Sequence, residues 1–446
     1  MQCPLPPHHL LCNSCSRISL FSCFSLCLFY SLIGCQSERE EVLPSLFAES
    51  SDSLFREVID NAEGYRLQII YTQIDRDESN RPSFCDYYFN VDSMVYFNPA
   101  STVKLPLALL SLEKLNTLGI EGVDKYTPVM FDSSFSTQTR KYTDSTSENG
   151  LPSIAHFIRK AFLVSDNDAY SRMYEFVGQG TINRMLHAKG YADTRITHRF
   201  VRMTSEENRH TNAVRFISPQ GDLLYAQPPA YNEDAFDFSR VEKLGKAHYD
   251  GNDSLVHEPM DFSQRNRMPL KELHEVLRAV MFPNAVPPRQ RFDLTEADYK
   301  FLYQYLSQFP GETNYPKYDS SEYFDSYVKF FFRNSLHHKL PEDVRVFNKV
   351  GWAYGFMTDA SYVADFQNGV EYMLSATLYV NSDSILNDNR YDYETVSHPF
   401  LYKLGQMIHQ HEIDRERKHM PDLSDFELVY ERRVDDDRPV VSDVDN

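Results

Sequence analysis

The distribution of predicted strands along the chain is the feature that most limits how it can fold. Strand patterns lie near both chain ends, and helical patterns fill the middle, mainly between Leu151 and Gly190, and close the chain. The predicted strands are Leu67–Ile74, Cys85–Val91, Val344–Lys349, Ala360–Ala364 and Glu371–Val380, and the other predicted helices include Ser51–Ala62, Thr102–Leu115, Pro269–Met281, Leu294–Leu306 and Tyr393–Gln410. This order predicts an α+β fold in which both chain ends form one antiparallel sheet, packed against a mostly helical subdomain.

The amino-terminal segment is expected to be an export signal outside the fold. An uncharged apolar run, Ile18–Gly34, ends at Cys35 and is followed at once by polar and acidic residues. This arrangement resembles a bacterial lipobox, which implies a signal peptide over 1–34, lipid on Cys35 and a polar tether over 35–50. An ordinary signal peptide that contains cysteine is the alternative. The expected location is that of an exported lipoprotein, in the periplasm, at the outer membrane or at the cell surface, with the lipid as the only membrane contact.

The cysteines agree with this interpretation. Of the seven cysteines, five precede Gly34, Cys35 would carry the lipid, and Cys85 alone would remain in the mature chain. An intramolecular disulfide and a cysteine-based metal site are therefore excluded.

The net charge of the chain limits which partners it can bind. The net charge of −19 makes binding to nucleic acid unfavourable, because both surfaces would be negative.

We predict one domain over 51–413 with an irregular polar insertion at about 213–265, followed by a charged, disordered tail over 414–446. The sequence does not indicate an oligomeric state.

Three short motifs are candidates for chemistry, although each is common by itself. The pattern S-x-x-K occurs at Ser101–Lys104, Ser111–Lys114 and Ser326–Lys329, and K-x-G occurs at Lys243, Lys349 and Lys403. Ser165-Asp166-Asn167 is the one S-D-N in the chain. Order and context distinguish three of them: Ser101 opens a buried helix, Ser165 lies between helices, and Lys349 ends a strand.

Ser101 and Lys104 have the chemistry of a nucleophile and its base. A serine hydroxyl needs a neighbouring base, and a spacing of three residues places both side chains on one side of a helix. Burial disfavours the ammonium form of a lysine, and a helix amino-terminus favours developing negative charge.

Together the motifs resemble class A β-lactamases and penicillin-binding proteins, over residues 50 to 413. The resemblance implies that the backbone N–H groups of Ser101 and Trp352, the residue after Gly351, form an oxyanion hole. It implies that Ser165 passes a proton to the leaving nitrogen, that Asn167 holds the substrate amide, and that Lys349 binds a substrate carboxylate. Asp166 is expected to be structural, and no cofactor or metal is implied.

Each site residue also has an ordinary interpretation. Ser165 and Asn167 are good caps for the helix that follows them, Lys349 suits the surface end of a strand, and Trp352 suits a core.

Two departures from the family pattern concern the substrate and the second half of the reaction. Val350 replaces the hydroxyl residue usual in K-T-G, which helps bind the substrate carboxylate. The E-x-x-L-N loop that supplies the deacylating base in class A enzymes is missing between Ser165 and Lys349. Glu207 is the nearest candidate for that base, and a solvated loop charge is the alternative.

Three functions remain open. The first is a serine hydrolase that opens a β-lactam or related amide through a Ser101 acyl-enzyme. The second is a cell-wall D,D-peptidase with a peptidoglycan-derived substrate. The third is a degenerate lipoprotein that binds peptidoglycan or a partner without catalysis.

Overall fold

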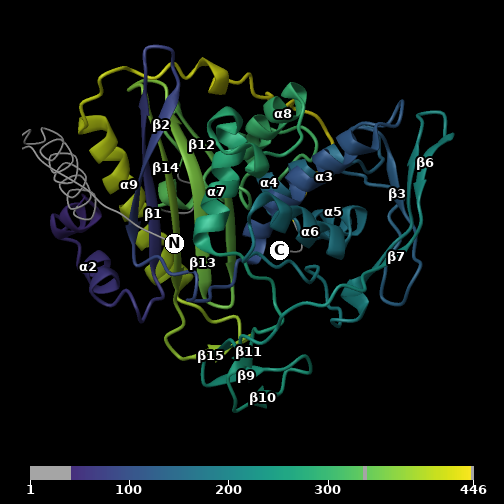
Figure 1. Ribbon diagram of the computed structural model, residues 1–446, viewed down its shortest axis with the longest axis horizontal. Coiled ribbons are helices and arrows are strands. Elements are labelled where there is room, and N and C mark those ends of the chain that lie inside the picture. Colours follow the sequence, from purple (N-terminus) through teal and green to yellow (C-terminus); the bar gives the residue numbers. More distant parts are fainter. Residues whose placement is uncertain (1–41, 335–338, 443–446) are drawn as a thin grey trace, which may run out of the picture.

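The structure, a computed structural model, describes residues 42–334 and 339–442. Within these residues a five-stranded antiparallel sheet has the order β12-β13-β14-β1-β2. Its strands are β1 (Gln68–Arg76), β2 (Pro82–Phe89), β12 (Val344–Ala353), β13 (Phe356–Asp365) and β14 (Val370–Tyr379). The two chain ends join where β1 pairs with β14, Ile70 opposite Ser375. The predicted sheet built by both chain ends is confirmed (Figure 1).

Both faces of this sheet are buried, and the alternation of side chains divides the core in two. Ile69 and Tyr71 pack on the side of α9 (His398–Asp414), whereas Ile70 packs on the side of α7 (Leu270–Met281). Successive side chains of a strand point to opposite faces, so a strand covered on both sides is apolar nearly throughout.

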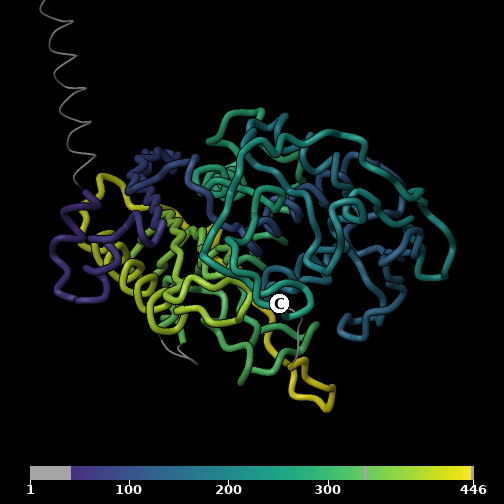
Figure 2. The backbone as a smooth tube through the Cα atoms, turned by 90° about the horizontal axis from the view of Figure 1, so that it is seen from below, coloured from purple at the N-terminus to yellow at the C-terminus, as the bar shows by residue number. Residues whose placement is uncertain are grey.

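The helical part of the molecule lies beside the sheet (Figures 1 and 2). Its elements are η1 (Ala100–Val103), α3 (Lys104–Leu118), α4 (Ile154–Leu163), α5 (Asn167–Val177), α6 (Gln179–Lys189) and α8 (Glu296–Ser307). The first two-thirds of α3 is buried on all sides, as its apolar sequence predicts. On the far side of the sheet, α2 (Ser53–Asp60) and α9 cover the second core.

Short strands make up the segment predicted as an insertion. They are β5 (Val214–Ile217), β6 (Leu223–Gln227), β7 (Ala230–Tyr231), β8 (Lys243–Leu244), β9 (Ala247–Tyr249), β10 (Leu255–Val256) and β11 (Met260–Asp261). Their partners outside the segment are β3 (Val129–Phe131), β4 (His210–Thr211) and β15 (Ile385–Leu386). The pairing of β9 with β15 ties the segment to the chain that follows the central sheet.

The structure corrects two predicted boundaries. Residues 42–48, expected to belong to a polar tether, are helical, and Leu43 and Phe47 are buried in the core beside α9. The carboxy-terminal residues to 442, expected to form a disordered tail, lie against the body of the protein, and Leu423 and Phe426 are buried. In both segments a few apolar side chains fix the chain, although the composition is mainly polar.

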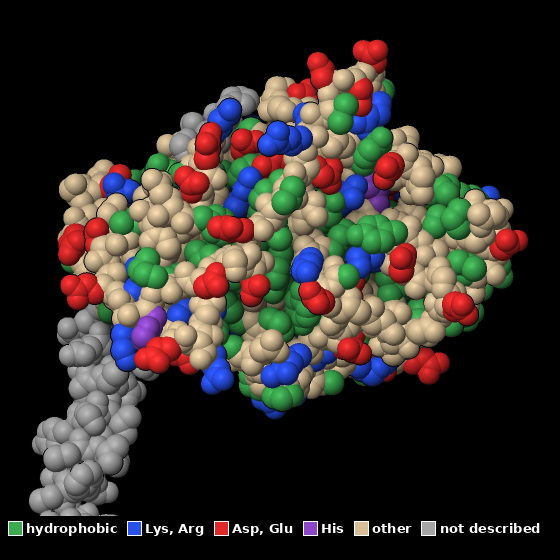
Figure 3. Space-filling model, turned by 90° about the horizontal axis from the view of Figure 1, so that it is seen from above, with side chains coloured by type: hydrophobic (Ala, Val, Ile, Leu, Met, Phe, Trp, Pro, Cys, Tyr) green, Lys and Arg blue, Asp and Glu red, His purple; other side chains and the backbone are tan. Residues whose placement is uncertain are grey.

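The predicted signal peptide and Cys35 lie outside the described residues. Within the described ranges, no helix combines the length and the apolar character needed to cross a bilayer. On the face seen from above, acidic and basic side chains are interspersed (Figure 3).

Candidate active site

Ser101 lies in a single 3-10 turn, η1, that leads directly into the buried helix α3. The turn is held by two bonds to the carbonyl of Pro99, from the backbone N–H of Thr102 at 2.9 Å and from its hydroxyl at 2.7 Å. The preceding residue, Ala100, has φ of 44°, which is unfavourable for a residue with a side chain. Backbone strain of this kind costs about 1–3 kcal/mol and is typical of functional turns.

Lys104, one turn further along the chain, is fully buried. Its Nζ donates to Asn167 Oδ1 at 2.8 Å, to Ser165 Oγ at 3.3 Å and to the Ser165 carbonyl. Burial, and then the charge of Lys349, lower the pKa of Lys104 well below its usual value, against the opposing effect of Asp166. This shift favours the neutral amine, which is the form that can accept a proton.

The S-D-N segment joins α4 to α5, and its three side chains have different tasks. Asp166 caps α5, because one of its oxygens accepts from the Ala169 N–H at 2.7 Å, and it pairs with Lys160 at 3.0 Å. The structural role predicted for Asp166 is thus seen, and the cap is not made by Ser165 or Asn167. Their side chains instead meet Lys104.

Lys349 lies on β12 and is buried, so it is not a surface lysine. Its Nζ donates to Ser165 Oγ at 3.1 Å and to the carbonyl of Val350 at 2.8 Å. Burial lowers the pKa of Lys349 to about 7, with Asp359 opposing and Lys329 adding to the shift. The Ser165 hydroxyl therefore lies between the amino groups of Lys104 and Lys349.

Gly351 allows β12 to pass directly over the Ser101 turn. A Cβ atom at Gly351 would lie 2.5 Å from the Pro99 carbonyl oxygen and 2.9 Å from the Ser101 nitrogen. Trp352 follows, and it lines the same cavity as Ser101 while its ring packs edge-on to Phe330. The close approach brings the backbone of Trp352 near that of Ser101, as an oxyanion hole formed by both requires.

A cavity of about 810 Å³ opens beside Ser101. One wall consists of residues 198–203, a second of Trp352, Ala353 and Tyr354, and a third includes His248–Gly251 and Met260 from the predicted insertion. That segment therefore contributes part of the wall of the cavity.

The structure places Glu207, the candidate deacylating base, outside the lining of the cavity at Ser101. The carboxylate of Glu207 accepts from the N–H and the hydroxyl of Thr204, at 2.7 and 2.8 Å, and Glu207 is not among the residues that line the cavity at Ser101. The side chain that faces Lys104 from this loop is Phe200, whose ring centroid lies 5.2 Å from Lys104 Nζ. Glu207 follows Phe200 by several residues, and the chain turns away before it.

The sequence patterns missed Phe200, since a phenylalanine in a polar loop carries no motif. They also missed the buried polar cluster of Lys329, Asn348 and Asp359, whose charges affect the pKa of Lys349. Lys329 is the lysine of another S-x-x-K match. Lys329 Nζ donates to Asn348 Oδ1 at 2.7 Å, and Asn348 donates to Asp359 at 2.9 Å. The Ser326–Lys329 match is thus a structural site in the core.

A serine at the start of a buried helix, a buried lysine one turn on, and a second serine between two lysines form the arrangement of serine β-lactamases and penicillin-binding proteins. Residues 52–222 match the model of the β-lactamase enzyme family. This part of the chain, which holds Ser101, Lys104, Ser165 and Asn167, is similar to the serine β-lactamase/transpeptidase-like superfamily. No curated protein is similar enough in sequence to match.

Solved β-lactamase structures are remotely similar. That from Xanthomonas campestris pv. campestris aligns at 13% identity over 80% of this chain and 96% of its own, with a TM-score of 0.44. Those from Desulfarculus baarsii and Sphaerobacter thermophilus align at 13% and 11% identity, over 78% and 80% of this chain and 95% and 97% of theirs, each with a TM-score of 0.41.

Proposed function

We propose that this protein is acylated on Ser101 by a β-lactam or a related amide and that it releases the acyl group slowly. The observation that carries the proposal is the contact set of Lys104. Its buried amine bonds to Ser165 and Asn167, while a phenylalanine, and no carboxylate, faces it from the loop over residues 198–203.

In acylation, neutral Lys104 accepts the proton of the Ser101 hydroxyl, and the oxygen attacks the substrate carbonyl. The backbone N–H groups of Ser101 and Trp352 stabilise the oxyanion. Ser165 donates its proton to the leaving nitrogen and is reprotonated from the lysines on either side of it. Asn167 positions the amide, and Lys349, where protonated, binds a carboxylate next to the leaving nitrogen.

Deacylation needs a base that activates a water molecule against the ester. Asp250 and Asp261 are the carboxylates that line the cavity within the described part of the chain. Asp250 accepts from the backbone N–H groups of Asn252 and Ser254, and Asp261 accepts from that of Ser263. The ring of Phe200 lies next to Lys104, in the position that a deacylating water and its base would need. The ester on Ser101 is therefore expected to persist, which favours a D,D-peptidase-like or acyl-binding protein over a fast β-lactamase.

Intact-mass spectrometry with benzylpenicillin tests this proposal. We expect a single adduct that survives after free penicillin is removed, and its absence in Ser101→Ala. Ser326→Ala, the serine of the other S-x-x-K, is the matched control and should be labelled normally. Rapid turnover without an adduct would replace the proposal with a β-lactamase, and a folded protein that is never labelled would favour the non-catalytic binding function.

We also propose that Cys35 carries lipid and anchors the exported protein. The support is the apolar run that ends at Cys35, before polar residues. Labelling with an alkyne fatty acid in the producing bacterium should mark the wild type and not Cys35→Ser, whereas equal labelling of both would reject the anchor.

A further inference from the structure

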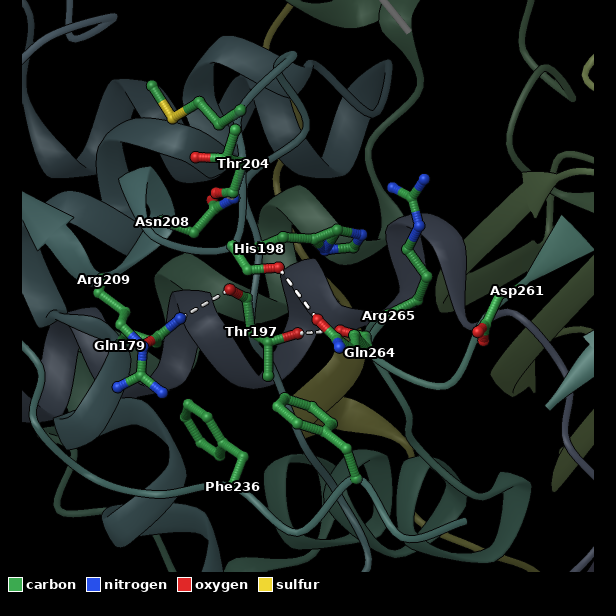
Figure 4. A pocket seen from close by; sticks show the side chains of 13 residues that line it. Gln179, Thr197, His198, Thr204, Asn208, Arg209, Phe236, Asp261, Gln264 and Arg265 are labelled. Atoms are coloured by element: carbon green, nitrogen blue, oxygen red, sulfur yellow. Dashed lines mark hydrogen bonds between the residues drawn. The ribbon is translucent and has the colours of Figure 1, made fainter. Parts of the chain in front are cut away.

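A second cavity, of about 370 Å³, adjoins the cavity at Ser101. The two share four lining residues, His198, Met203, Asp261 and Arg265. The smaller cavity also has the polar side chains of Asn208 and Gln264 in its lining (Figure 4). This extension has no role in the acylation chemistry described above.

Arg265 is the unusual side chain at the junction. It is half-buried, and within the described residues its guanidinium makes no ion pair and no hydrogen bond. Asp261, the acid that lines both cavities, accepts instead from the Ser263 N–H at 2.8 Å. Arg209, in the smaller cavity, is occupied by the carbonyls of Asn232 and Asp234.

His198 provides a second unsatisfied group at the same junction. Its Nδ1 is buried and has no hydrogen-bond partner among the described residues. Burial, followed by the charge of Arg265, lowers the pKa of His198 to about 3, so the ring is neutral and Nδ1 can carry a hydrogen. Buried polar groups are usually paired, and an unpaired one indicates a missing partner.

A cation and a neutral N–H donor that both lack partners suit an anion with two oxygens. Arginine binds a carboxylate with two parallel hydrogen bonds. The chain as a whole has a net charge of −19, so an anionic group needs a local cation to bind at all.

The direction of the cavity assigns the anion to one half of the substrate. The cavity is lined by Ser101, by Trp352 and Ala353 at the end of β12, by Tyr354 just after this strand, and by Arg265. Lys349 and Ser165, which serve the leaving nitrogen, do not line it. A group beside Arg265 therefore belongs to the acyl half of the substrate, which stays on the enzyme.

We propose that Arg265 and His198 bind a carboxylate carried by the acyl half of the substrate, so that the natural substrate is an amide with an anionic acyl side chain. This inference rests on the proposed acylation of Ser101. It assigns a specificity site to the end of the segment that the sequence identifies only as an insertion, together with His198 from the loop before it.

Two penicillins that differ by one carboxylate on the acyl side chain, carbenicillin and benzylpenicillin, provide the test. The measured quantity is the ratio of the acylation rate constant for carbenicillin to that for benzylpenicillin. We expect this ratio to be about tenfold higher in the wild type than in Arg265→Gln, which is the effect of one partly solvated charge-assisted hydrogen bond. His198→Phe should reduce the preference in the same direction. Arg390→Gln, the loss of an exposed arginine outside both cavities, should leave the ratio unchanged.

An equal ratio in the wild type and in Arg265→Gln would overturn the inference while leaving acylation intact. If neither penicillin acylates the wild type, the proposed acylation by β-lactams is rejected, while the carboxylate site remains to be tested. Equilibrium binding of the two compounds to Ser101→Ala, with and without Arg265→Gln, then decides the carboxylate site. Equal affinity of Ser101→Ala for both compounds would reject it.

Discussion

Phe200 is the side chain on which the proposed slow deacylation depends. Its ring faces the Lys104 amine, which also contacts Ser165 and Asn167. An aromatic ring excludes water and accepts no proton. The residues for acylation are thus together, while the position next to them holds an apolar side chain.

Phe200→Glu should shorten the lifetime of the acyl-enzyme. A carboxylate at this position can activate a water against the ester, and general base catalysis contributes about 10²–10⁴-fold. The decay of the penicillin adduct, followed by intact mass, measures the effect, and Phe200→Gln provides the control without a base. An unchanged lifetime in Phe200→Glu would show that Phe200 does not occupy the site of the deacylating water.

Lys349 should give acylation an alkaline limit. Its lowered pKa of about 7 means that the ammonium form is present below this pH and is lost as the pH rises through it. We expect the second-order rate constant for benzylpenicillin to fall above about pH 7, because the substrate carboxylate loses its cation. Lys349→Arg keeps the positive charge and should remove this decrease in the rate constant. A decrease that persists in Lys349→Arg would have to be assigned to another titrating group.

At the scale of elements, the site depends on one contact between β12 and η1. The strand carries Lys349 and Trp352, and the 3-10 turn carries Ser101. Gly351 is the point where the two backbones touch. The proposed oxyanion hole therefore depends on the packing between two elements that are far apart in the sequence.

Gly351→Ala should disrupt this contact. The new methyl group would meet the rigid backbone at 2.5 Å from the Pro99 oxygen, so β12 must move away from Ser101. We expect acylation to slow by about 10²-fold or more, the cost of losing an oxyanion-hole donor. Gly311→Ala, where the nearest atom belongs to the Asp325 side chain at 3.3 Å, is the control for both the acylation rate and the melting temperature. Normal acylation in Gly351→Ala would mean that β12 does not contribute to the hole.

At the scale of the molecule, the chain closes on itself. After α9 the polypeptide returns over the sheet and inserts Phe426 among the rings of Phe282, Tyr303, Phe347 and Tyr362. Phe426 is 5% exposed. The carboxy-terminal segment thus belongs to the folded unit, although 32 residues beyond Asp414 are mostly polar or charged.

Phe426→Ala should lower the free energy of unfolding by about 3 kcal/mol, the usual cost of emptying a buried aromatic site. Urea denaturation followed by fluorescence measures the change. Val429→Ala, at a side chain that is 95% exposed, should have little effect. Equal stability of Phe426→Ala and the wild type would restore the interpretation of a dispensable tail.

The sequence by itself determined the α+β fold, the sheet shared by both chain ends, and the group of Ser101, Lys104, Ser165, Asn167 and Lys349. The helices, strands and single motifs follow from local patterns, because periodicity and short spacing are local. The grouping of the five site residues, which lie on different elements, follows from the family resemblance that the three motifs carry together. Tertiary structure decided the rest: Phe200 in place of Glu207, the contact at Gly351, the unpaired Arg265, and the burial of Phe426. Each depends on which residues meet across long stretches of chain, and that is fixed by packing rather than by any local pattern.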